Sequence, residues 1–140
     1  MGKTLNIYTD GGSRGNPGPS AIGIYICSED GTKIAALKKR LGVTTNNIAE
    51  YQAVLHAFDF LDKQPTTASF MVFYLDSLLV ASQLSGLYKI KNPKLKEIRG
   101  QIAKYENKFR DQNINIKYQH ILRKFNKKAD ALVNEALDYK

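Results

Sequence analysis

Apolar and polar residues alternate in the first part of the chain, which is the pattern of strands with one buried face. The alternation runs over Thr4–Thr9, Ala21–Cys27 and Lys33–Leu41, and a period of two residues indicates a β-strand. Asp30-Gly31, between the second and third segments, is typical of a hairpin turn. These segments predict three strands that pair as an antiparallel sheet.

The rest of the chain switches between helical periodicity and short apolar runs. Apolar residues three and four positions apart predict an amphipathic helix from Asn46 to Lys63. Phe70–Leu75 is a continuous apolar run, as expected for a strand that is covered on both faces. Beyond it we expect a short helix, a longer helix, a fifth strand and a final helix, over residues 78–84, 93–110, 114–118 and from Asn126 onward. The expected helix caps are Thr44, Thr45 or Asn46 for the first helix, Ser77 for the short helix and Asn126 for the final helix.

The order βββαβααβα predicts how these elements are arranged. Strands one, four and five are joined through helices, so they should run parallel and lie in the middle of the sheet. The fold class is therefore α/β, with a five-stranded mixed sheet of three antiparallel and then parallel strands, and with helices on both faces. Asp10 and Asp76 follow strands one and four, and binding sites form beyond the carboxyl ends of parallel strands.

Length and composition limit the class of protein. The chain has 140 residues, 43% of them hydrophobic, which predicts one domain over residues 1–140 with a real core. The single cysteine, Cys27, lies in an apolar run and fits a reducing compartment. No apolar stretch reaches the ~20 residues of a membrane span. We expect a cytoplasmic monomer without a membrane partner.

The net charge of +8 is concentrated in one part of the chain. Residues 1–85 contain seven basic and seven acidic residues, whereas residues 86–128 contain thirteen basic and three acidic ones, a local net of +10. A solvated basic surface would explain this excess. The functional alternative is a surface that faces the phosphates of a nucleic acid.

Four carboxylates stand out against this positive background: Asp10, Glu50, Asp76 and Asp130. Each has a structural explanation, as a turn residue, as an acid in the first turn of a helix, or as part of a helix entry. Together they would repel one another at a single edge of the sheet unless a cation bound them. Magnesium accepts carboxylates together with phosphate oxygens and water, so the set predicts metal-assisted phosphodiester hydrolysis.

Four segments carry a resemblance to a known family: YTDGGSRGNPGP, TTNNIAEYQAV, YLDSLLVASQLSGLYKIKN and HILRKFNKKADALVNEA. Each holds one of the four acids, and together they resemble the type 1 ribonuclease H family. The resemblance implies the ribonuclease H-like fold and two Mg²⁺ ions per site, with Mn²⁺ as the alternative. Asp10 would bridge the ions, Glu50 and Asp76 would bind one of them, and Asp130 would bind the ion that activates water. The implied reaction is endonucleolytic hydrolysis of the RNA strand of an RNA–DNA hybrid, which leaves 5′-phosphate and 3′-hydroxyl ends.

The same resemblance suggests further site residues. His120 lies at the position of the family's mobile histidine, which moves protons or helps the product leave; a histidine that only packs at a strand end is the alternative. The resemblance also implies two groups of substrate-binding residues. The first would contact the RNA strand or let it approach the backbone closely. The second would hold phosphates of the DNA strand. The first group is Gly11, Gly12, Asn16, Asn46 and Asn47, and the second is Thr45 and Lys91. Asn46 could equally cap its helix, and Lys91 could simply be solvated.

The chain departs from the family in one region. Several bacterial members carry a basic handle rich in tryptophan between the middle helices, but here the connection is short and Trp is absent. The resemblance is therefore to a variant without the handle, in which Lys94, Lys96 and Arg99 could partly replace it; an ordinary helix surface is the alternative. Two alternatives remain: a binding module that holds hybrids or double-stranded RNA without cutting them, or the same chemistry on duplex RNA or RNA–DNA junctions. A transposase-like DNA target would require an additional target-binding domain.

Overall fold

A five-stranded mixed sheet forms the centre of the molecule, in a computed structural model that describes residues 2–139. The strand order is β3-β2-β1-β4-β5. β1 pairs antiparallel with β2, and β2 with β3, whereas β4 pairs parallel with both β1 and β5. The strands are β1 Lys3–Ser13, β2 Gly18–Ser28, β3 Lys33–Thr44, β4 Ala68–Leu75 and β5 Asn115–His120. The predicted fold class and element order are confirmed, but β5 lies at the edge of the sheet and not in its middle as expected, because it pairs with β4 alone.

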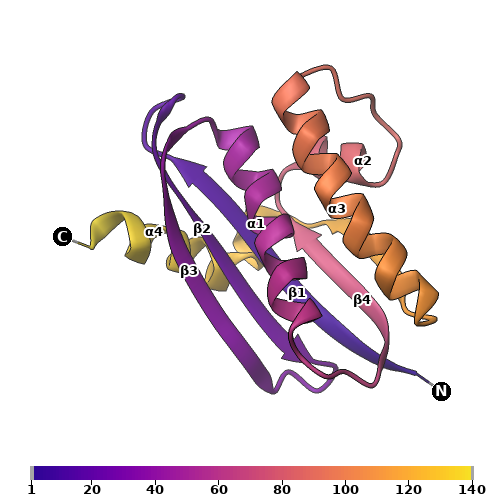
Figure 1. The fold of residues 1–140 in the computed structure, drawn as a ribbon. Coiled ribbons are helices and arrows are strands. Elements are labelled where there is room, and N and C mark those ends of the chain that lie inside the picture. Colours follow the sequence, from indigo (N-terminus) through magenta and orange to yellow (C-terminus); the bar gives the residue numbers. More distant parts are fainter. Residues whose placement is uncertain (1, 140) are drawn as a thin grey trace.

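The helices cover both faces of this sheet (Figure 1). The structure has α1 Asn46–Asp62, α2 Leu78–Leu84, α3 Pro93–Asp111, a 3₁₀ turn η1 Arg123–Phe125, and α4 Lys127–Asp138. α1 and α3 lie on one face, and α4 lies alone on the opposite face. The two faces are therefore covered unequally, because α4 is short and packs mainly over β1, β2 and β3.

The core lies between the sheet and the α1–α3 face. Alternate residues of β4, among them Met71 and Phe73, are fully buried there against Tyr51 and Phe58 of α1. Burying a side chain of this size contributes about 1.5 to 3 kcal/mol. On the other face, a Cβ at Gly23 would lie 2.2 Å from the Ala129 carbonyl oxygen. Only glycine therefore lets α4 approach β2 this closely.

Two local expectations need correction, and the helix caps are among those expected. β1 does not end before Asp10 but keeps pairing with β2 as far as Ser13. Glu50 is the fifth residue of α1 and lies beyond its first turn, which contains no acidic residue, so the helix dipole does not explain it. Among the candidate caps of α1, Thr45 is the one observed, and its side chain accepts from the Ile48 amide; the Ser77 cap of α2 is as predicted.

A buried ion network joins α3 to β5. The Arg99 guanidinium donates to Glu106 at 2.9 and 3.4 Å and to the Leu84 carbonyl at 3.2 Å. The Tyr118 hydroxyl donates to the same carboxylate at 2.6 Å. Arg99 is thus a structural residue, and not the free surface cation that would replace a basic handle. Residues 85–92 join α2 directly to α3, so no extra helix stands at the handle position.

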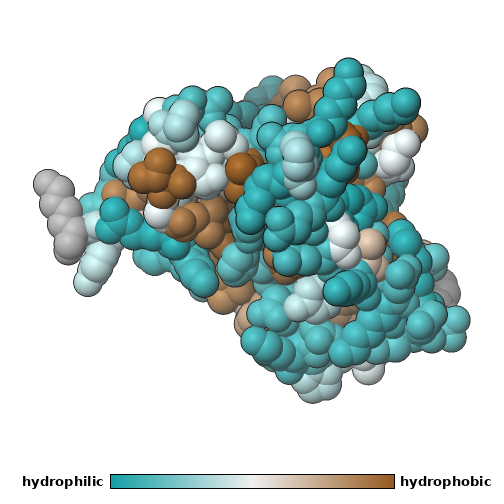
Figure 2. Space-filling view, turned by 45° about the horizontal axis from the view of Figure 1, so that its top comes forward, coloured by the Kyte–Doolittle hydropathy of each residue, from teal (hydrophilic) through white to brown (hydrophobic). Residues whose placement is uncertain are grey.

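The surface is mainly polar. Hydrophilic side chains dominate the face in Figure 2, where hydrophobic residues gather only in small patches. Between residues 2 and 139, no helix combines the length and the apolar character that crossing a membrane requires. The cytoplasmic location, the monomeric state and the single-domain organisation stay predictions.

Candidate active site

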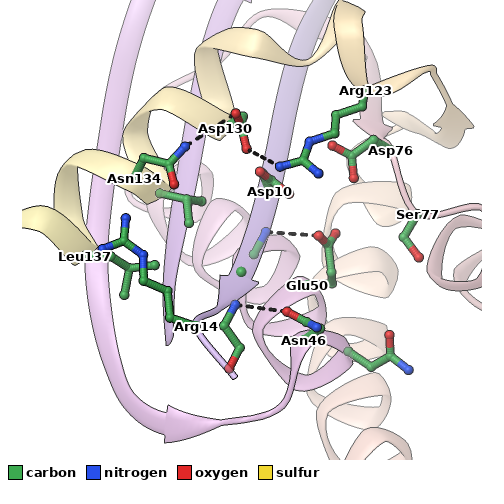
Figure 3. A pocket seen from close by; sticks show the side chains of 15 residues that line it. Asp10, Arg14, Asn46, Glu50, Asp76, Ser77, Arg123, Asp130, Asn134 and Leu137 are labelled. Atoms are coloured by element: carbon green, nitrogen blue, oxygen red, sulfur yellow. Dashed lines mark hydrogen bonds and ion pairs between the residues drawn. The ribbon is translucent and has the colours of Figure 1, made fainter. Parts of the chain in front are cut away.

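The parallel pairing of β1 and β4 ends just before the candidate site. Its last register pair is Tyr8↔Tyr74; Asp10 lies two residues later on β1, and Asp76 lies two residues later, directly after the end of β4. Side chains two residues apart on a strand point to the same face, so these carboxylates leave the sheet side by side. They line a cavity of ≈ 390 Å³ together with Glu50 and Asp130 (Figure 3). The structure therefore brings all four predicted carboxylates to one edge of the sheet.

Glu50 reaches this cavity from α1 because β1 and α1 are in very close contact. A Cβ at Gly11 would lie 2.2 Å from the carbonyl carbon of Ala49, so any larger residue would push the helix away. The Gly11 amide donates to Glu50 Oε1 at 3.2 Å. Glu50 is only 6% exposed, and among the described residues its Oε2 finds no hydrogen-bond partner.

These three acids form the part of the site that best fits a metal ion. Asp10, Glu50 and Asp76 each offer one carboxylate oxygen, and the three oxygens lie within 4.8 Å of one another. Burial, with smaller contributions from the charges of Asp76 and Asp130, raises the pKa of Asp10 to about 7. Burial, followed by the charge of Asp10, also raises the pKa of Glu50 well above its usual range. A divalent cation would neutralise the repulsion between these carboxylates and would give Glu50 Oε2 a partner. This donor set therefore fits a hard ion such as Mg²⁺.

Asp130 faces the cavity from the first turn of α4. Its carboxylate pairs with the Arg123 guanidinium at 3.3 Å and accepts from the Asn134 amide at 3.5 Å (Figure 3). It does not belong to the group of three oxygens that lie within 4.8 Å of one another. The positive charge next to the Asp130 carboxylate is thus the Arg123 guanidinium.

Asn126 is a site residue that the sequence reasoning missed. It occupies the N-cap position of α4 as predicted, but its side chain makes no cap hydrogen bond. Its amide instead donates to the Thr9 carbonyl at 2.9 Å and to Asp76 Oδ2 at 3.3 Å. With 1% exposure, it ties β1 to the carboxylate that follows β4. A polar residue four positions before Asp130 was the available signal, but capping explained it equally well.

The predicted substrate residues surround the mouth of this cavity. Gly11, Gly12, Asn46 and Asn47 line it, together with Arg14, which sequence reasoning also missed. Asn46 Oδ1 accepts from the Ser13 amide at 2.9 Å, and the Asn46 amide donates to Asn16 Oδ1 at 3.0 Å. These bonds connect the loop after β1 to the start of α1.

A second hollow of ≈ 390 Å³ continues from the asparagines. Asn16, Thr45, Asn47 and Lys91 line it, so the residues expected to contact the two strands of a substrate occupy adjoining surfaces. Their roles in binding stay predictions.

His120 lies apart from the carboxylates. It ends β5 in register with Leu75, the last residue of β4, and its side chain is half-buried. The described residues that line the carboxylate cavity do not include it. A role in proton movement stays a prediction.

Comparisons with known proteins agree with this geometry. A family model described as reverse transcriptase-like matches residues 8–136. The bifunctional protein of Mycobacterium tuberculosis is 38% identical over 133 residues, which cover 94% of this chain but 35% of the relative. This chain thus spans about a third of the length of that relative.

Two further proteins match along nearly their whole length. A ribonuclease H from Clostridium botulinum is 32% identical over 149 residues, which cover 97% of both chains. The crystal structure of LC11-RNase H1 in complex with an RNA/DNA hybrid superposes with a TM-score of 0.86 at 40% identity, and covers 96% of each chain. The sheet order, the carboxylate cavity and these matches show that the chain belongs to the type 1 ribonuclease H family.

Proposed function

We propose that this chain is a metal-dependent endoribonuclease that hydrolyses the RNA strand of RNA–DNA hybrids and leaves 5′-phosphate and 3′-hydroxyl ends. The observation that carries the proposal is the set of three carboxylate oxygens within 4.8 Å of one another. A site of this kind in a chain of net charge +8 combines metal ligands with long-range attraction for a polyanion. The complex of LC11-RNase H1 with an RNA/DNA hybrid supports this choice of substrate.

Asp10, Glu50, Asp76 and Asp130 would hold two Mg²⁺ ions, or Mn²⁺ as the alternative. Bound divalent ions supply an activated water and stabilise the charge that develops on the leaving oxygen. The buried carboxylates prepare for this binding because their raised pKa values mean that they exchange protons for the cations. Metal affinity should therefore increase with pH.

Other residues of the chain hold the carboxylates in place. The Gly11 amide fixes one oxygen of Glu50, and Asn126 fixes one oxygen of Asp76. Residues that orient metal ligands in this way commonly affect metal affinity or activity by 10- to 100-fold. Asp130 starts in an ion pair with Arg123, and it would leave this partner when a cation binds.

Recognition of a hybrid requires groups that distinguish RNA from DNA by the 2′-hydroxyl. Asn16, Asn46 and Asn47 would contact the RNA strand, since an amide side chain can donate to a hydroxyl and accept from it. Gly11 and Gly12 would let the RNA backbone approach β1. Thr45 and Lys91, on the adjoining hollow, would hold phosphates of the DNA strand, and His120 would move a proton or help the product leave.

A cleavage assay with matched substrates tests this function. A labelled RNA–DNA hybrid, duplex RNA, an RNA–DNA junction and duplex DNA are each incubated with and without Mg²⁺, with the wild type and with Asp10→Asn. We expect the wild type to cut only RNA strands and only with Mg²⁺. Asp10→Asn should lower the rate at least about 10³-fold, because it removes a ligand worth several kcal/mol of transition-state stabilisation.

Two outcomes would overturn the proposal. Unchanged cleavage by Asp10→Asn would exclude the carboxylate site, and binding of hybrids without any Mg²⁺-dependent cleavage would indicate the binding module. Cleavage of duplex RNA or of junctions at the same rate would keep the chemistry and change the substrate. Gel filtration in the same buffers checks the expected monomer.

A further inference from the structure

Three tyrosines form a row across the sheet on the face that carries α4. Tyr25, Tyr8 and Tyr74 are register partners on β2, β1 and β4. Tyr8 and Tyr74 stack with their ring centroids 4.7 Å apart. Tyr8 and Tyr74 lie two residues before Asp10 and Asp76, about 7 Å along their strands and on the same face. The row therefore borders the candidate active site.

A groove of ≈ 340 Å³ opens over two members of this row, Tyr8 and Tyr25. We call it the tyrosine groove and define it by Tyr8, Tyr25, Lys124, Phe125, Lys127 and Lys128, which line it. Phe125 is 63% exposed, so its ring is available to a ligand. Among the described residues that line the groove there are three lysines and no carboxylate.

The lysines lie directly beside the aromatic rings. Lys128 Nζ is 4.4 Å from the centroid of Tyr25 and donates to its hydroxyl at 3.2 Å. Lys124 Nζ is 5.1 Å from the centroid of Phe125. A contact between an exposed lysine and a ring is weak, so each ammonium group can exchange the ring for a phosphate.

We propose that the tyrosine groove binds a single-stranded segment of nucleic acid next to the active site. Stacked aromatic rings with interspersed cations are the means by which proteins hold bases and phosphates together without sequence preference. A duplex cannot use the rings, because its bases are paired and stacked inside the helix. An acidic protein segment would match the lysines but gain little from the exposed Phe125 ring and the partly exposed tyrosine rings.

One short segment connects the groove to the active site. Arg123 and Asp130 line the carboxylate cavity, whereas Lys124, Phe125, Lys127 and Lys128 line the groove. A strand that leaves the cavity over η1 would therefore reach the groove directly. The groove would hold the single-stranded continuation of a substrate whose paired part lies at the carboxylates. Binding in the groove needs neither a metal ion nor cleavage, so it can be tested separately from the proposed hydrolysis.

The first test measures binding alone. A fluorescein-labelled oligothymidylate of about ten nucleotides is titrated with protein in EDTA and followed by fluorescence anisotropy. Phe125→Ala should weaken binding about tenfold, since one stacked base contributes on that scale. Lys124→Gln/Lys127→Gln/Lys128→Gln should weaken it further and reduce the slope of log K against log salt by about 2, at about 0.7 per phosphate contact on a single strand.

Matched variants control for charge and for apolar exposure. Lys94→Gln/Lys96→Gln/Lys104→Gln removes the same charge from exposed positions of α3, and Leu87→Ala removes another exposed apolar side chain. Both controls should retain most of the binding. Equal losses in the two triple variants, or unchanged binding by Phe125→Ala, would overturn the proposal, and would leave the groove to a protein partner or to solvent. Circular dichroism confirms that each variant is folded.

The second test links the groove to a substrate. A blunt hybrid and hybrids whose RNA strand has a single-stranded extension at either end are compared as ligands of Asp10→Asn in EDTA, because the RNA strand is the one that would lie at the carboxylates. One of the extended hybrids should bind several-fold more tightly than the blunt one, and Phe125→Ala in the same background should remove this difference. If the extension brings no advantage at either end, a groove that continues the substrate path is excluded. An inactive wild type would count against the hydrolysis proposed above but would leave these binding results unaffected.

Discussion

Two buried glutamates in this molecule have opposite surroundings. Glu106, between α3 and β5, is 2% exposed and receives hydrogen bonds from Arg99 and Tyr118. Glu50, at the edge of the sheet, is 6% exposed and receives one bond, from the Gly11 amide. Its nearest charged neighbours are other acids, Asp10 and Asp76.

The difference separates a structural charge from a functional one. A buried carboxylate that is fully hydrogen-bonded and paired with an opposite charge holds the surrounding elements together. Removing one partner lowers the stability of the fold, because it leaves the other charge buried without compensation. A buried carboxylate beside like charges destabilises the fold until a cation arrives. Sequence does not distinguish the two, since both are glutamates within helices, whereas their neighbours do.

The largest expected effect is on the Glu106 network. Glu106→Ala leaves Arg99 without its partner in a partly buried position, so we expect the free energy of unfolding to decrease by about 3 to 5 kcal/mol. Urea denaturation followed by circular dichroism measures this. Glu97→Ala, on the same helix but exposed and 3.9 Å from Lys94, should cost less than about 0.5 kcal/mol. A similar small cost for Glu106→Ala would mean that this network contributes no more than a surface pair.

In the carboxylate cavity, removing a charge should stabilise the metal-free protein, and the size of this effect should depend on pH. The pKa of Asp10 rises from 3.8 to about 7 on folding, so between these values the folded state holds more protons than the unfolded state. The free energy of unfolding of the metal-free protein should therefore fall as the pH rises through this window, by about 2 to 4 kcal/mol, and then level off.

Denaturation in EDTA at several pH values measures this decrease. Asp10→Asn has no proton to lose at this position, so its stability should vary less with pH and exceed that of the wild type at pH 7. Saturating Mg²⁺ should restore the stability of the wild type. Parallel pH profiles for the two proteins would contradict the assignment of a raised pKa to Asp10.

A smaller effect is expected at Asp76, the carboxylate of the cavity that accepts a hydrogen bond from a side-chain amide. Asn126→Ala removes the amide that holds Asp76 and the Thr9 carbonyl, so we expect the Mg²⁺ concentration for half-maximal activity to rise about 10- to 100-fold. Activity at saturating Mg²⁺ should largely recover, whereas a merely unfolded protein would not be rescued. Asn134→Ala, whose amide is 3.5 Å from Asp130 and exposed, is the matched control and should change the Mg²⁺ requirement less than about threefold.

The smallest effect concerns Arg123. It pairs with Asp130 and gives this carboxylate the neighbouring positive charge that Glu50 does not have. The pair is 3.3 Å long and its arginine side chain is 79% exposed, so Arg123→Ala should leave the stability within about 0.5 kcal/mol. Removing a competing positive charge should tighten Mn²⁺ binding about two- to fivefold, as measured by calorimetry without substrate. Lys124→Ala removes the adjacent charge as a control. Weaker Mn²⁺ binding by Arg123→Ala would show that Arg123 does not compete for Asp130.

The fold was predictable because its determinants are local and periodic. The alternation over Thr4–Thr9, the continuous run Phe70–Leu75 and the amphipathic stripe of α1 each identify their elements without tertiary information. The convergence of Asp10 and Asp76 followed from topology, since parallel strands joined through helices bring their carboxyl ends together.

The details that failed depend on contacts between distant segments. The extension of β1 past Asp10 comes from pairing with β2 as far as Ser13, and an Asp-Gly-Gly sequence gives no sign of it. Asn126 looks like a helix cap in sequence, but its amide instead bonds to Thr9 and Asp76. Arg99 appears as a surface cation of α3 until Glu106 and Leu84 are seen beside it. Each error assigned a local role to a side chain with a long-range partner.

The hydrogen bond from Asn126 to Thr9 closes a loop of 117 positions along the chain, and this has a consequence for biosynthesis. A ribosome releases β1 with Asp10 first, and α4 with Asp130 last among the elements described. A nascent chain that has emerged only as far as β5 can already form the sheet and the packing of α1 and α3, but it lacks one carboxylate and the tether of Asp76. During synthesis, the complete constellation of acids therefore forms only after the last described helix has emerged.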